Sequence, residues 1–228
     1  MQKENPQAVA EKDRFVEFVE KTLVAAREHK SQVTLGVAGV VLCLVLVAGT
    51  GLYRHKAARQ ASLAFQMLKV DFQALEAKEG REVALQRWLG QAPEALASIK
   101  GGAATYDAAL LWYGGLAFES GDFESASAWY ASAAKGFDSG SALRNIALCG
   151  QAQALEGLGK ADEAASIYEK VRASAASVKQ EEATFLLARI KEKSGDTQGA
   201  ESLYREILES PSTSLYKDLA AEKVAGQY

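Results

Sequence analysis

One spacing of residues occurs three times in this chain of 228 residues. A glycine is followed five positions later by an alanine, and a tyrosine comes four positions after that alanine. Another small residue stands seven positions before each glycine. The three sets are Gly114, Gly121, Ala126 and Tyr130; Ala152, Gly159, Ala164 and Tyr168; and Ala188, Gly195, Ala200 and Tyr204. Repetition at intervals of 38 and 36 residues indicates stacked copies of one structural unit.

Each copy predicts two helices joined by a tight turn at its glycine. A glycine just past the end of a helix tolerates the left-handed backbone that closes it. The small residues let the two helices approach closely, and we expect the tyrosine to pack into the next unit. The chain has only three prolines, which also favours helices.

The segments that carry these sets resemble tetratricopeptide repeats. They read "LLWYGGLAFESGDFESASAWYASA", "LCGQAQALEGLGKADEAASIYEKV" and "TFLLARIKEKSGDTQGAESLYREI". The resemblance implies an α-solenoid of divergent repeats, closed by a capping helix at "SLYKDLAAEKVAGQ". A degenerate repeat is expected upstream, with Gly80, Leu85, Leu89 and Ala92 in the corresponding places. The predicted fold class is therefore all-α, with one transmembrane helix before the solenoid.

That transmembrane helix is predicted for Val33 to Tyr53, which carries no charged residue. Twenty-one residues of helix reach about 32 Å, which matches the hydrocarbon core of a bilayer. A cleavable signal peptide is the alternative, but its apolar core would be shorter and closer to the N-terminus. The Lys and Arg residues on the two sides are equal in number, so the positive-inside rule does not give the orientation.

These features divide the chain into four predicted segments. They are a charged, amphipathic N-terminal segment (1–32), the transmembrane helix (33–53), a long helix with the degenerate repeat (54–103), and three divergent repeats with the capping helix (104–228). Within the first segment, Phe15, Phe18 and Leu23 share one helical stripe. Such a stripe is typical either of a helix lying on a membrane or partner, or of a solvated extension of the membrane helix.

No arrangement of residues in the sequence predicts catalysis. The two histidines, His29 and His55, flank the transmembrane segment on opposite sides, so the repeats contain no histidine base. Cys43 and Cys149 have no nearby metal-ligating partner and are expected to be small buried apolar residues. The net charge of −3 offers no basic stripe for nucleic acid. We therefore expect no enzyme activity, no cofactor, no metal, no nucleic acid and no small-molecule substrate.

Binding of protein segments is the role that remains. In tetratricopeptide arrays the first helices line a groove that can hold a peptide. The corresponding positions here are Leu111, Phe118, Gln153, Glu156, Phe185, Arg189 and Glu192. Phe118 and Phe185 are the candidate aromatic anchors, with ordinary packing between helices as the alternative.

The order of segments resembles the YfgM-type ancillary subunits of the SecYEG translocon. The resemblance rests on the amphipathic start, the apolar segment followed by "YRHKAARQASLAFQML", and "TYDAALLWYGGLAFESGDFESA". It implies a cytoplasmic N-terminus, one inner-membrane helix and a periplasmic repeat domain that contacts translocon subunits and a periplasmic chaperone. Two alternatives stay open: an architectural subunit of a larger envelope assembly, and a precursor receptor that faces the cytosol.

Overall fold

The computed structural model describes residues 30–226, which form nine α-helices and no strand. The segment 1–29, which holds the predicted amphipathic stripe, lies outside the described residues. The helices are α2 (Lys30–Glu79), α3 (Arg81–Ile99), α4 (Ala103–Ser120), α5 (Phe123–Gly136), α6 (Ala142–Gly157), α7 (Ala161–Arg172), α8 (Gln180–Lys193), α9 (Thr197–Glu209) and α10 (Leu215–Ala225). The described chain is all-helical, as the sequence predicts.

The chain divides into two compact units, Met1–His55 and Lys56–Tyr228. The described part of the first unit is the apolar N-terminal portion of α2. Its large apolar side chains, such as Leu35 and Leu44, are exposed. The stretch Ala38–Glu79 of α2 contains a window long and apolar enough to cross a membrane, and that window is not buried by the rest of the protein. The predicted transmembrane segment Val33–Tyr53 lies within α2.

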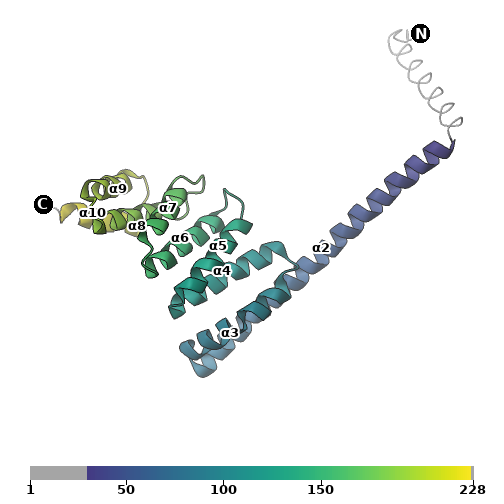
Figure 1. Cartoon of the computed structure of the whole chain (residues 1–228), viewed down its shortest axis with the longest axis horizontal. Coiled ribbons are helices and arrows are strands. Elements are labelled where there is room, and N and C mark those ends of the chain that lie inside the picture. The colour runs from purple at the N-terminus through teal and green to yellow at the C-terminus, as the bar shows by residue number, and fades with distance from the viewer. Residues whose placement is uncertain (1–29, 227–228) are drawn as a thin grey trace, which may run out of the picture. The chain divides into compact units, whose positions relative to one another are not determined.

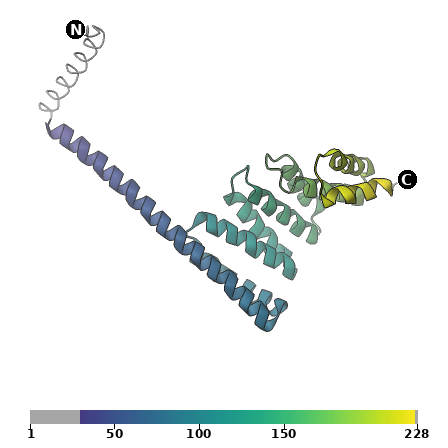
Figure 2. The same cartoon turned by 180° about the vertical axis from the view of Figure 1, so that it is seen from behind.

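In the second unit the helices pack in chain order. From α3 to α10, each helix contacts the next one along the chain, and contacts that skip a helix are few. Figures 1 and 2 show α4 to α10 as a succession of neighbouring helices. Such connectivity means that a side chain on one helix acts mainly on the helices just before and after it.

The glycines of the repeated spacing occupy the turns. Gly121, Gly159 and Gly195 have φ angles of 82°, 75° and 89°, a left-handed backbone that side chains with a Cβ rarely adopt. Each follows the end of α4, α6 or α8, as the sequence predicts. Asp122 and Asp196 then begin the following helices, because their carboxylates accept hydrogen bonds from backbone N–H groups of the first turn.

The other members of the repeated sets form the contacts between helices. All six small residues that stand before or after the turn glycines are buried: Gly114, Ala126, Ala152, Ala164, Ala188 and Ala200. Tyr168 and Tyr204 are fully buried, and Tyr130 is half-buried. A Cβ on Gly114 would lie 2.8 Å from the Tyr130 ring, and one on Gly150 of α6 would lie 2.6 Å from it. The Tyr130 ring therefore lies against glycines of the helix before it and the helix after it.

An aromatic cluster forms the core at the start of the second unit. It holds all three tryptophans of the chain, Trp88, Trp112 and Trp129, from α3, α4 and α5. Phe72 of α2 lies between two of them, with ring centroids 5.8 Å from Trp88 and 5.5 Å from Trp112. In the predicted degenerate repeat, Gly80 has φ 90° and separates α2 from α3. Leu85 and Ala92 are buried and Leu89 is half-buried.

Candidate functional site

Two buried tyrosines hold two carboxylates in place, one on α6 and one on α8. The Tyr168 hydroxyl donates to Glu156 Oε1 at 2.7 Å, and the Tyr204 hydroxyl donates to Glu192 Oε2 at 2.9 Å. In both pairs the glutamate precedes the tyrosine by 12 residues. Burial, reinforced by the bonded carboxylate, raises the pKa of both tyrosines. Both phenols therefore stay protonated and act as fixed donors.

Each of these glutamates also pairs with a basic residue from the next part of the chain. Arg189 of α8 contacts Glu156 at 3.0 Å, and Lys223 of α10 contacts Glu192 at 2.9 Å. Hydrogen bonds from Lys223 and then Tyr204 lower the pKa of Glu192. These two pairs and Gln153 lie on α6, α8 and α10, and we call the five residues the polar row.

The polar row continues into a second group of charges at the start of α8. Gln153 Nε2 donates to Glu182 Oε1 at 2.9 Å, and Lys179 forms an ion pair with the same carboxylate. Glu182 is buried. Lys179 has φ 69°, a left-handed conformation that is uncommon for a residue with a side chain. The lysine ammonium thus supplies the charge that a buried carboxylate requires.

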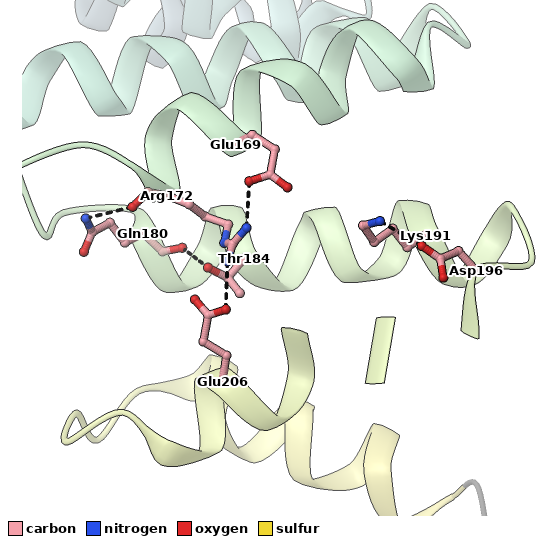
Figure 3. A network of polar contacts seen from close by, with 7 residues as sticks. All are labelled: Glu169, Arg172, Gln180, Thr184, Lys191, Asp196 and Glu206. Carbon is pink, nitrogen blue, oxygen red and sulfur yellow. Dashed lines mark hydrogen bonds and ion pairs between the residues drawn. The ribbon is translucent and has the colours of Figure 1, made fainter. Parts of the chain in front are cut away.

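A cleft of about 660 Å³ opens beside Glu182. Its lining includes Arg172, Glu206 and Tyr216. Figure 3 shows the Arg172 guanidinium between the carboxylates of Glu169 and Glu206, each 2.7 Å away. Burial and the charge of Glu182 raise the pKa of Tyr216 to about 12. The cleft is therefore lined by paired charges and a neutral phenol.

Near α10, the cleft is lined by the carboxylate of Glu181 and the serines that it binds. The hydroxyls of Ser210, Ser212 and Ser214 all donate to Glu181. Burial favours the protonated form of Glu181, but these three bonds together with Lys217 outweigh it and lower its pKa. This carboxylate holds the loop between α9 and α10 in place through these three bonds.

The apolar members of the predicted groove lie among packed side chains. Leu111 is half-buried against the aromatic cluster, and Phe118 packs edge-on against Phe123 with ring centroids 5.4 Å apart. Phe185 is only 7% exposed, with its ring 5.5 Å from that of Tyr204 and 5.7 Å from that of Tyr216. The structure thus pairs Glu156 with Arg189, leaves both of them, Gln153 and Glu192 partly exposed, and places Phe185 beneath α10.

Comparison with models of known protein families and with curated proteins gave no match. Within residues 30–226 no group of three or more His, Cys, Asp or Glu side chains is placed to hold a metal ion.

The sequence-based set lacks several residues of this site, among them Lys179, Glu182, Tyr216 and Lys223. One signal for the site was present in the sequence, namely the 12-residue spacing from Glu156 to Tyr168 and again from Glu192 to Tyr204. In the first of the three repeats, Phe118 stands 12 residues before Tyr130 in place of a glutamate, which hides the pattern. Nothing in the local sequence marks Lys223 as the partner of Glu192.

The two cysteines differ in their surroundings. Cys43 is exposed on α2, contrary to the expectation that both are buried, because α2 is uncovered there. Cys149 is buried beside Lys179 and Glu182, and burial, with the charge of Glu182, raises the pKa of its thiol from 9.0 to about 12. Only the thiolate is nucleophilic, so Cys149 is expected to be inert near neutral pH.

Alkylation of the full-length Cys43→Ser variant at pH 8 tests this expectation. A pKa near 12 leaves a thiolate fraction roughly a thousandfold below that of a thiol at 9. We expect no labelling by iodoacetamide until denaturant is added. Adding Ser166→Cys, on the exposed face of α7, gives the positive control. Labelling of Cys149 in the folded protein at the rate of that control would contradict its burial.

Proposed function

We propose that this chain is a membrane-anchored adaptor that binds segments of other proteins along the polar row. The observation that carries the proposal is the row itself, with donors and acceptors on α6, α8 and α10, in which buried tyrosines hold the carboxylates of Glu156 and Glu192. Support also comes from helices that pack in chain order, as the repeats of a tetratricopeptide solenoid do.

The chemistry of the row favours polar segments of a partner. Arg189, Glu192 and Lys223 are each partly exposed. The backbone amides and charged side chains of a bound segment can therefore meet both positive and negative groups of the row. Because these groups are already held in place, binding does not have to order them. Because Phe185 lies under α10, recognition here depends on hydrogen bonds and charge more than on aromatic anchors.

The remaining parts of the proposal concern place and partner. The apolar stretch of α2 serves as the single membrane anchor, with the N-terminus in the cytoplasm and the helical unit in the periplasm. Similarity to the YfgM-type family supports translocon subunits, a periplasmic chaperone, or the segments that emerge from the channel as partners. The protein acts without catalysis and without a cofactor.

Site-specific photo-crosslinking tests the adaptor role. A photoreactive residue replaces Gln153 or Arg189 in the full-length protein in cells, and Lys170 on the exposed face of α7 is the matched control. We expect discrete adducts with translocon or chaperone subunits at the first two positions and none at Lys170. Equal adducts at all three positions, or none at any, would contradict binding along the row.

A C-terminal tag tests the orientation in the membrane. We expect protease to remove the tag in intact spheroplasts, because the helical unit faces outward. Protection of the tag until lysis would place this unit in the cytosol and would exclude the periplasmic adaptor, leaving the cytosol-facing receptor.

A further inference from the structure

A stripe of large apolar side chains on α2 lies exposed within the second unit. Leu63, Met67 and Val70 are 66%, 66% and 61% exposed. The two alanines that continue this face, Ala74 and Ala77, are also exposed. Large apolar groups in a row mark an interaction surface more often than single exposed ones do.

The opposite face of the same helical segment is already used inside the chain. Ala61 and Phe72 are buried there, and Phe65, Leu68 and Leu75 pack against the same core. The segment is therefore apolar on two faces, of which α3 and α4 cover only one. The stripe is not needed to hold α2 in the fold.

The spacing of the stripe is that of a coiled-coil seam. The exposed positions Gln60, Leu63, Met67, Val70, Ala74 and Ala77 alternate in steps of three and four, which places them at a and d of a heptad. Seven residues before Leu63, the same heptad position is occupied by Lys56, so the apolar seam begins after Lys56.

The residues beside the seam suit a second copy of this chain in parallel register. In a parallel pair, each g position faces the e position of the following heptad in the partner. Gln66 would face Asp71, and Gln73 would face Lys78. Arg59 would face Ala64, so no pair of like charges meets across the seam.

We propose that two copies of this chain associate in parallel through the α2 stripe. Insertion of both copies in the membrane with the same orientation excludes the antiparallel pairing. It also raises their effective concentration, so that a short seam suffices for association. This inference rests on the proposed membrane anchor and is independent of the proposed role of the polar row.

Disulfide crosslinking of the full-length protein in membranes tests the dimer. Val70→Cys, at a d position, is made in the Cys43→Ser background. Ser62→Cys is the matched control, exposed on the same helix but off the stripe. Because d residues face each other in a parallel pair, mild oxidation should give about tenfold more covalent dimer from Val70→Cys than from Ser62→Cys.

A second variant addresses the contact without a disulfide. Leu63→Glu with Val70→Glu should convert the purified protein from dimer to monomer by light scattering, with the helical content unchanged. Equal crosslinking at both cysteine positions would overturn the proposal, as would a monomer before substitution. Crosslinks from Val70→Cys to a different protein alone would assign the stripe to that partner and also overturn it.

Discussion

Replacing Ala126 by tryptophan is expected to lower the free energy of unfolding by about 3 kcal/mol, through overpacking. For a chain of this length the loss corresponds to a fall in melting temperature of about 10 °C. Ala126 is fully buried and shares its cluster with Ala117 and Ala154, which are fully buried as well. These alanines come from α4, α5 and α6, so an indole ring there would force three helices apart.

The matched control is Ala128→Trp. Ala128 lies two residues along the same helix and is exposed, so its replacement adds the same ring without displacing a neighbour. Thermal melting followed by circular dichroism at 222 nm measures both variants in the same detergent. If Ala126→Trp had the same melting temperature as Ala128→Trp and the unaltered protein, the three helices would not approach closely at Ala126.

The sequence could predict the elements that depend on local rules. Gly121, Gly159 and Gly195 mark the turns because the left-handed backbone there is readily adopted only by glycine. The sequence also predicts that the alanines are buried, because small residues repeated at a fixed helical position allow two helices to approach closely. The exposed apolar stretch of α2 needs only length and composition.

The candidate site depended on contacts between distant parts of the chain, and local pattern does not supply these. Position on a first helix predicts Arg189 and Glu192 as groove residues, but their partners, Glu156 and Lys223, lie 33 and 31 residues away. The position of Phe185 shows the same limit. Its spacing suits a groove anchor, and only the way α10 lies over it, with Tyr216 against its ring, decides that it is buried.

Phe185→Ala is accordingly expected to destabilise the C-terminal helices strongly. Removal of a buried phenylalanine side chain costs about 3 to 5 kcal/mol through lost burial and the cavity left behind. Gln153→Ala is the control in the polar row: it removes one partly exposed hydrogen bond to Glu182, and we expect a loss of about 1 kcal/mol. Melting of both full-length variants at 222 nm compares the two costs.

The tryptophans show where the loss occurs. All three lie in the aromatic cluster of α3 to α5, whereas Phe185 belongs to a separate core formed by α6 to α10. Because each helix contacts chiefly its neighbours, damage at Phe185 should reach the first core weakly. In Phe185→Ala we therefore expect the helical signal to fall at a lower temperature than the tryptophan fluorescence changes. If both probes gave the same melting temperature for Phe185→Ala as for the unaltered protein, Phe185 would not be buried and would be available as a groove anchor. A single transition lowered equally by both probes would keep it in the core and show that the two cores unfold as one.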